Sequence, residues 1–130
     1  MKKTLMIGMV SFLVHCSGNG NTISDAQNAL ATWESKNILH YSYTIEGTGF
    51  SFPGESVIEA QCGEIINGPG STISELLISI IESGDGECLI SASFDDEFGV
   101  PVERFDDCGE EGSGYRISDF TVVDALVDCI

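Results

Sequence analysis

The cysteines constrain the fold of this 130-residue chain more than any other feature of its sequence. Cys16 closes an apolar N-terminal segment, and four more follow: Cys62, Cys88, Cys108 and Cys129. An even number of cysteines in an exported domain indicates a disulfide framework, and four cysteines allow three pairings. We therefore expect two disulfides in the part of the chain that follows Cys16.

The register of one expected hairpin favours a particular pairing. The chain is expected to turn around Phe98-Gly99 between two strands. If Phe94 faces Val102, the same register places Cys88 opposite Cys108, and directly opposed strand residues are close enough for a disulfide. Each such bridge contributes about 2–4 kcal/mol to a small domain.

The remaining pair would be Cys62–Cys129, which ties the middle of the chain to its C-terminal end. A zinc site is the alternative use of these cysteines. The sequence has no C-x-x-C motif, and His40, the one histidine after Cys16, is remote from the cysteines along the chain. Disulfides are therefore the favoured interpretation.

Residues 1–16 have the organisation of a bacterial signal peptide. Lys2 and Lys3 form a basic beginning, residues 4–14 are apolar, and a polar stretch follows. An apolar segment of this length is too short to cross a bilayer as a helix. A buried N-terminal helix is the alternative, but the order of the three parts favours a signal.

The end of this segment resembles a lipobox, the sequence at which a bacterial cysteine is lipidated. Leu13 and Cys16 fit that pattern, whereas His15 stands where a small residue is usual. We expect residues 17–23 to form a flexible tether, with Ser17 favouring sorting to the outer membrane. The prediction is a lipoprotein on the periplasmic face of the outer membrane; the alternative is a soluble secreted or periplasmic protein.

The charge balance excludes whole classes of partner. The chain carries 21 acidic and five basic residues, a formal charge of −16. Without the signal only three basic residues remain against the same 21 acidic ones, which gives −18. Such a chain cannot neutralise phosphates, so nucleic acid is excluded as a partner. The charge also raises solubility and opposes compaction.

Periodicity predicts one α+β domain over residues 24–130, with two amphipathic helices packed on a mainly antiparallel sheet as two layers. Capping boxes begin the helices at Ser24 and Thr72, Asn37 stops the first, and the glycines of residues 47–49 interrupt the first strand. The expected order αβββαβββ comprises helices over 24–36 and 72–83, and strands over 39–46, 56–61, 64–67, 87–95, 100–107 and 115–127.

A set of motifs spans the expected domain: Trp33 near the end of a helix, Tyr41 and Tyr43 on a strand, Val57 with Gly63 and Ile65 around a turn, the helix segment 72–77 with Ile80, the run from Phe94 to Pro101, and Asp119. This set resembles a family of uncharacterised bacterial secreted proteins and lipoproteins that is defined by a domain of unknown function. The resemblance covers about residues 24–125, and its most specific part is the run from Phe94 to Pro101. Many family members have Cys-x-Cys where this chain has residues 47–49, so no disulfide pattern is implied. The resemblance implies export and fold, and it carries no catalytic residues.

Enzymatic chemistry is not expected. Nucleophilic catalysis needs a nucleophile, a base and an orienting group, and His40 is the only histidine after the signal. It lies on the polar side of an expected strand, where a partly exposed structural histidine is the usual interpretation. No phosphate-binding loop, dinucleotide fingerprint or metalloprotease helix occurs. A small hydrolase that works through His40 is the least favoured hypothesis.

Calcium is the one cofactor that the acidic residues suggest. Calcium requires six to eight oxygen ligands from flexible loops, but no Asp-x-Asp-x-Asp-Gly spacing occurs. A solvated acidic surface is the favoured interpretation, with Asp95 capping its turn. The candidate ligands, in the expected hairpin turn and the loop after the next strand, are Asp95, Asp96, Glu97, Asp106, Asp107, Glu110 and Glu111.

The combined expectation is a non-enzymatic binding or interaction module of the bacterial cell envelope, anchored through Cys16 and acting on an unknown protein partner. The alternatives are an acidic module that responds to divalent cations and a secreted inhibitor that presents acidic loops to a basic target. An aromatic binding patch is not expected, because spacing places most of Trp33, Tyr41, Tyr43, Phe94 and Phe105 in the core.

Overall fold

The computed structural model describes residues 19–49, 54–109, 112–123 and 128–129. These residues form two α-helices, a short 3₁₀ turn and six strands. The elements, in chain order, are α1 (Gly20–Lys36), β2 (Tyr41–Gly49), β3 (Glu55–Gln61), β4 (Glu64–Asn67), α2 (Ile73–Glu82), η2 (Ser83–Asp85), β5 (Leu89–Phe94), β6 (Pro101–Asp107) and β7 (Gly112–Val122).

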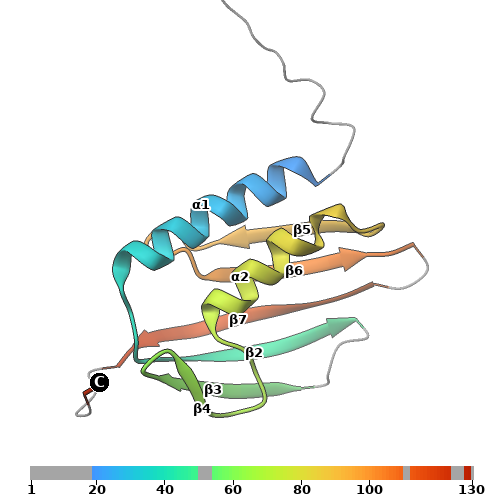
Figure 1. Cartoon of the computed structure of the whole chain (residues 1–130). Helices are drawn as coiled ribbons and strands as arrows, with labels where there is room; N and C mark the ends of the chain where they lie inside the picture. Colours follow the sequence, from blue (N-terminus) through green and yellow to red (C-terminus); the bar gives the residue numbers. More distant parts are fainter. Residues whose placement is uncertain (1–18, 50–53, 110–111, 124–127, 130) are drawn as a thin grey trace, which may run out of the picture.

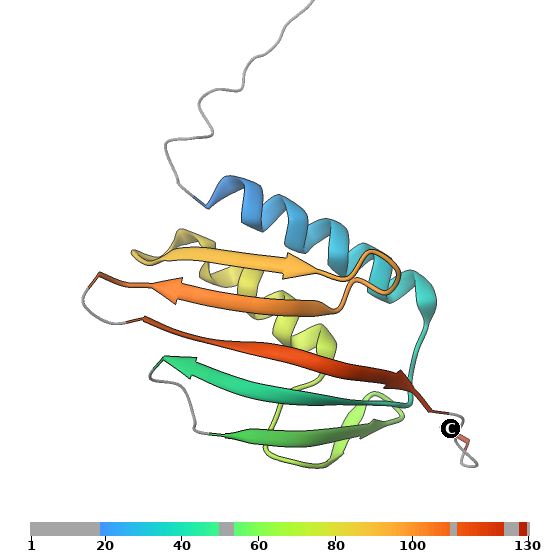
Figure 2. The same cartoon turned by 180° about the vertical axis from the view of Figure 1, so that it is seen from behind.

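The fold is the two-layer α+β domain that the sequence predicts. The six strands form one sheet in the order β4-β3-β2-β7-β6-β5, and every neighbouring pair is antiparallel. Both helices lie on the same face of this sheet (Figure 1). Seen from behind, the opposite face carries no helix (Figure 2). An antiparallel sheet tolerates this arrangement because one of its faces can meet water.

The core lies between the helices and the sheet. Alternate residues of β2, Tyr41, Tyr43 and Ile45, point into it, as their spacing predicts. Trp33 of α1 is also buried and meets Tyr41 edge-on, with ring centroids 5.2 Å apart. Leu39 was expected on the same face, but it precedes the strand and is exposed.

Most of the aromatic residues expected in the core lie there, and Phe105 is the exception. It lies on the uncovered face, where 38% of its surface is exposed. Its ring covers Gly112 of the neighbouring strand β7, since a Cβ atom at that glycine would lie 2.4 Å from the ring. An aromatic ring that shields a strand glycine compensates for the missing side chain.

Helix α1 begins earlier than its sequence predicts. We expected a flexible tether over residues 17–23 and a capping box at Ser24, but the helix starts at Gly20 and Asn19 is its N-cap residue. Residues 20–23 are thus helical, and the boundary at residue 24 is wrong. The end of the helix is confirmed: Asn37 adopts the left-handed conformation that terminates it.

Helix α2 follows its sequence signals closely. Thr72 accepts a hydrogen bond from the backbone N–H of Glu75, and the Glu75 side chain accepts one from the Thr72 backbone. This is the predicted capping box, which satisfies two donors that a helix start leaves free. Ile73, Leu77 and Ile80 are fully buried by the resulting helix face.

The boundaries of five strands differ from the expected ones, and two of these differences lengthen a strand by three residues at one end. Strand β2 runs through Gly47 to Gly49, so the predicted interruption is wrong. Strand β7 starts at Gly112 rather than at residue 115, and it ends at Val122. Pairing explains both extensions, because the end of β2 and the beginning of β7 lie side by side in the sheet, with Gly49 opposite Ser113.

The β5–β6 hairpin has the predicted register over most of its length. Leu89 pairs with Asp107 and Ser93 with Glu103, which places Cys88 opposite Cys108. The register shifts by one residue near the turn, so Phe94 pairs with Pro101 rather than with Val102. The prediction is therefore correct at the cysteine end and wrong at the turn.

Candidate functional site

Two disulfides lie at opposite ends of the sheet, and they join the cysteine pairs that the sequence favours. Cys62 is bonded to Cys129 with their Cα atoms 5.3 Å apart. Cys88 is bonded to Cys108 with a Cα separation of 4.3 Å. The expected disulfides are thus present, and the residues around each pair define what its sulfur atoms can do.

Cys62 occupies the turn between β3 and β4. Cys62 and Gly63 have φ values of 54° and 74°, so both central residues of this two-residue turn are left-handed. That combination is typical of the turns that join antiparallel strands with their natural twist. The backbone N–H of Gly63 donates to the carbonyl of Leu39, which fixes the turn against the chain that enters β2.

His40 touches both partners of the Cys62–Cys129 disulfide. The backbone N–H of Cys62 donates a hydrogen bond to Nδ1 of His40 at 3.3 Å. The other ring nitrogen of His40, Nε2, lies 3.6 Å from Cys129 Sγ. A ring nitrogen that accepts a hydrogen bond carries no hydrogen, so the neutral imidazole has its hydrogen on Nε2. His40 therefore presents an N–H donor to the sulfur of Cys129.

His40 is remote from the cysteines along the chain, but the fold brings it beside one cysteine pair. Tyr41 pairs with Ala60 across the β2–β3 hairpin, which brings the residue before β2 to the turn after β3. The signal that could have located His40 was this register. The position of Cys129 depends on β7 lying beside β2, which no local pattern indicates.

His40, Cys62 and Cys129 are also the only group of three potential metal ligands found among the residues that the structure describes, with donor atoms within 4.8 Å of one another. Thiolates, not disulfide sulfurs, bind metals. In the disulfide form the two sulfurs are engaged with each other, and the donor atom that faces Cys129 bears a hydrogen. A metal would require both reduction and a change of tautomer.

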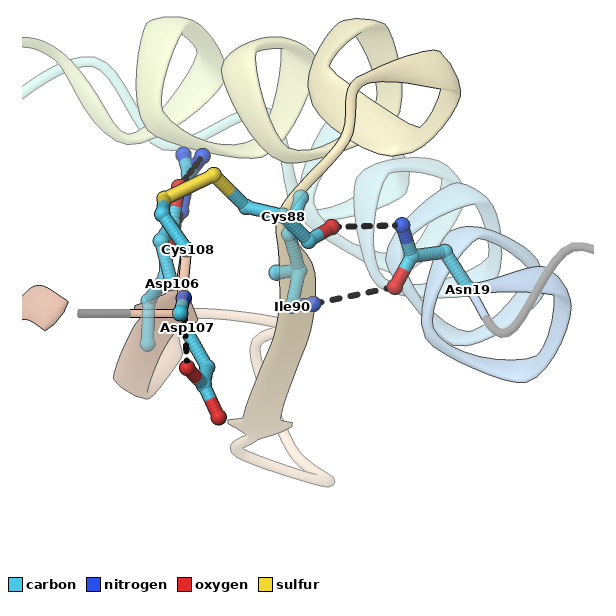
Figure 3. The surroundings of a disulfide bond; sticks show 8 residues. Asn19, Cys88, Ile90, Asp106, Asp107 and Cys108 are labelled. Atoms are coloured by element: carbon cyan, nitrogen blue, oxygen red, sulfur yellow. Dashed lines mark hydrogen bonds and ion pairs between the residues drawn. A yellow bond between two sulfur atoms is a disulfide. The ribbon is translucent and has the colours of Figure 1, made fainter. Parts of the chain in front are cut away.

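The Cys88–Cys108 disulfide lies beside the start of α1 (Figure 3). The side chain of Asn19 accepts a hydrogen bond from the Ile90 backbone N–H at 2.9 Å and donates to the carbonyl oxygens of Cys88 and Gly84, each at 3.1 Å. Asn19 is 2% exposed. It thereby occupies backbone groups that the edge strand β5 would otherwise present to solvent or to another strand.

The side chain of Thr22 extends this protection by donating to the Ile90 carbonyl at 3.0 Å. Both backbone groups of Ile90 thus point away from β6, which marks Ile90 and Asp106 as a non-hydrogen-bonded pair. Cys88 and Cys108, two residues further along, belong to the same class of pair. The short Cα separation in such pairs suits a disulfide.

Arg104 of β6 is a buried charged residue near the Cys88–Cys108 end of the sheet. Its guanidinium makes two bonds to the carboxylate of Asp106, at 2.7 and 2.9 Å, and donates to Ser79 of α2 at 3.0 Å. Beside it, burial raises the pKa of Tyr115 to about 12, although the positive charge of Arg104 acts in the opposite direction. Asp106 is therefore engaged in an internal ion pair.

The candidate calcium ligands that the structure describes lie at the two ends of the β5–β6 hairpin and form no metal-binding group. Asp95 accepts a hydrogen bond from the Phe98 N–H at 2.6 Å, so it caps the turn as its position suggests. Asp107 accepts one from the N–H of Gly109, at the other end of the hairpin. Asp96 and Glu97 stay at the turn with Asp95 and are exposed. Glu110 and Glu111 lie outside the described residues, as does Cys16 with the signal segment.

A surface depression of about 450 Å³ lies between α1 and the end of β5. It is lined by polar and acidic side chains that include Asp25, Asn28, Asp95 and Asp96. Among the residues that the structure describes, no helix is both long enough and apolar enough to span a membrane.

Comparison of the chain with family models, with curated proteins and with solved structures found no match. The family resemblance that its motifs suggest stays a prediction.

Proposed function

We propose that the protein is a non-enzymatic binding module of the bacterial cell envelope, anchored by a lipid on Cys16. The observation that carries this proposal is the use of Cys62, Cys88, Cys108 and Cys129 in two disulfides. Disulfides persist in oxidising compartments such as the periplasm. A signal-like segment that ends in a lipobox-like sequence supplies the route to that compartment.

The distance between the anchor and the domain supports a position close to the membrane. Asn19 is buried and hydrogen-bonded to the β5 edge, so it belongs to the folded domain. Only Ser17 and Gly18 separate it from Cys16. A chain of this length spans at most about 10 Å. The domain would therefore sit on the membrane surface instead of extending from it on a long tether.

Charge complementarity favours a partner with a basic surface. Arg104 is paired with Asp106, and Arg116 forms ion pairs with Glu103 and Glu46. Two of the three positive charges beyond the signal are thus neutralised within the domain, and the surface keeps a large acidic excess. Such an excess accelerates association with cationic partners and makes the complex sensitive to salt.

The anchor is tested by the intact mass of the protein recovered from a Gram-negative host. We expect a chain that starts at Cys16 and carries a diacylglycerol and an acyl group, found in the outer-membrane fraction. The variant Cys16→Ser should lose the lipid and stay uncleaved or become soluble. His15→Ala is the matched control, and it should increase the lipidated fraction because it restores a small residue. An unlipidated wild-type chain that begins beyond Cys16 would contradict the anchor.

The partner class is tested by crosslinking in intact cells from an engineered photoreactive residue at Asp96, with the same residue at Glu64 as the control. We expect a specific adduct that disappears as salt is raised in the isolated envelope. Adducts that are insensitive to salt would contradict a charge-driven interaction. This result would leave the anchor standing, because the mass measurement tests it separately.

A further inference from the structure

The surroundings of the Cys62–Cys129 disulfide differ from those of its counterpart in one chemically important way. His40 directs an N–H at the sulfur of Cys129. Beside Cys88–Cys108, the side chain of Asn19 instead forms hydrogen bonds with backbone groups, the carbonyl of Cys88 and the N–H of Ile90. Cys129 is exposed and Cys62 is half-buried, so small thiols can reach the pair.

We propose that Cys62–Cys129 is a reactive disulfide that exchanges with an external dithiol, and that His40 makes Cys129 the leaving sulfur. A thiolate of the dithiol attacks Cys62 Sγ and forms a new bond to it. The Cys62–Cys129 bond breaks, and its electron pair passes to Cys129 Sγ, where the Nε2–H of His40 stabilises the thiolate. Exchange is faster when the leaving thiol has a low pKa.

The second half of the reaction completes the electron balance. The other thiolate of the dithiol attacks its own sulfur in the mixed disulfide and expels the thiolate of Cys62. The dithiol is oxidised to a disulfide by two electrons, and the cysteine pair is reduced by the same two. Both cysteine thiolates then take protons from water. The substrate class is therefore a small dithiol or a protein with two neighbouring thiols.

His40 acts as a hydrogen-bond donor and not as a metal ligand. The backbone N–H of Cys62 occupies Nδ1, so the imidazole needs no rearrangement to hold its hydrogen on Nε2. A metal on Nε2 would displace that hydrogen to Nδ1, where it would face the N–H of Cys62. The turn that carries Cys62 thereby selects the tautomer that serves a thiolate.

The opposite disulfide lacks this assistance and is held in a hairpin that favours its return. Cys88 and Cys108 lie next to the paired residues Leu89 and Asp107. The strand pairing therefore keeps the two sulfurs close together when the disulfide bond between them is broken. A leaving thiolate at that distance re-attacks at a high effective concentration. We therefore assign the structural role to Cys88–Cys108.

The test is a timed reduction of the folded protein by dithiothreitol at pH 7, with alkylation and peptide mass mapping at each time point. We expect Cys62–Cys129 to be reduced about tenfold faster than Cys88–Cys108. His40→Ala should slow the first reaction about threefold, because the leaving thiolate of Cys129 loses its hydrogen-bond donor. The second disulfide is the internal control, and its rate should not change.

A second measurement identifies the sulfur that is attacked. Brief treatment with glutathione should place the mixed disulfide on Cys62 in the wild-type protein, and His40→Ala should reduce that preference. Leu39→Ala, a change at the exposed neighbouring residue, should keep it. If His40→Ala unfolds the domain, both disulfides will accelerate together, and His40→Gln then replaces it.

Equal reduction rates, earlier reduction of Cys88–Cys108, or adducts on Cys129 would overturn the assignment. Tight one-to-one binding of Zn²⁺ by the reduced protein, abolished by His40→Ala, would also overturn it, because His40 would then be a ligand.

Discussion

The two ends of the sheet use a disulfide in different ways. At the start of α1, Cys88–Cys108 closes a hairpin whose outer edge is covered by Asn19 and Thr22. At the other end, Cys62–Cys129 joins a tight turn to the C-terminal segment, and the imidazole of His40 lies beside this bridge. One bridge reinforces contacts that already exist nearby, whereas the other connects segments that are distant in sequence. The same covalent bond can thus reinforce a local hairpin in one region, and in another both join distant segments and offer a reactive group.

The largest expected effect comes from removing each bridge in turn. In the chain-entropy view a crosslink stabilises more when it closes a longer loop, and the sequence separations are 67 and 20 residues. We expect the double variant Cys62→Ala/Cys129→Ala to lose about 4 kcal/mol and Cys88→Ala/Cys108→Ala about 3 kcal/mol of unfolding free energy. Urea unfolding of both variants measures the difference.

The opposite ranking would show that local contacts outweigh loop length. In that case the hairpin end would be the more dependent on its crosslink, despite the shorter loop, and the division between a reinforcing and a connecting bridge would have to be revised.

The next effect is at the covered edge. Asn19→Ala removes three hydrogen bonds and leaves the N–H of Ile90 and two carbonyls without the side-chain partner they have now. We expect a loss of about 3 kcal/mol, since buried polar groups that lose their partners are costly. Asn21→Ala, two residues away and exposed, is the matched control and should change the stability by less than about 0.5 kcal/mol.

Hydrogen exchange should localise that loss. In Asn19→Ala the amide of Ile90 should exchange faster, while the amide of Cys62 at the other end keeps its protection. A uniform acceleration at both ends would mean that Asn19 supports the whole domain and not the edge alone.

High pH tests the buried phenols that lie between the two ends. Burial raises the pKa values of Tyr41, Tyr43 and Tyr115, the last to about 12. Because the folded-state pKa lies above the unfolded value near 10, the stabilisation is complete below pH 10 and is lost as pH rises through the folded pKa. We expect Tyr115 to account for about 2 kcal/mol of the loss by pH 12.

Tyr115→Phe should therefore flatten part of the decline in unfolding free energy above pH 10, as followed by urea unfolding at successive pH values. A curve identical to that of the wild type would indicate that Tyr41 and Tyr43, which are hydrogen-bonded to the chain at the start of α2, dominate the alkaline transition.

The smallest expected effect compares two hairpin turns. Gly63 has a φ of 74° and no atom near the position of a Cβ. Gly63→Ala should therefore lower the unfolding free energy by only about 1 kcal/mol, which is the strain of a left-handed backbone at alanine. At Gly99 a Cβ would lie 2.2 Å from the carbonyl oxygen of Ala29. Gly99→Ala should therefore lower the melting temperature more than Gly63→Ala does, and similar losses would show that α1 can move away from the turn.

Local patterns in the sequence predict several parts of this molecule well. The capping box of α2, the alternation of Tyr41 and Tyr43, and the register that pairs Cys88 with Cys108 all depend on residues close together in the chain. Short-range sterics and hydrogen bonds decide such features, so they are written in the sequence. The start of α1 was missed because its N-cap makes its side-chain bonds to distant residues.

Only the tertiary structure decided the candidate site. Asn19 reaches Ile90 across 71 residues and His40 reaches Cys129 across 89, and both contacts depend on the order of strands in the sheet. That order results from burying one face of six strands under two helices, a requirement that acts on the whole chain at once. The amino-acid sequence by itself determined which cysteines could pair, while packing determined that the Cys62–Cys129 pair lies beside His40.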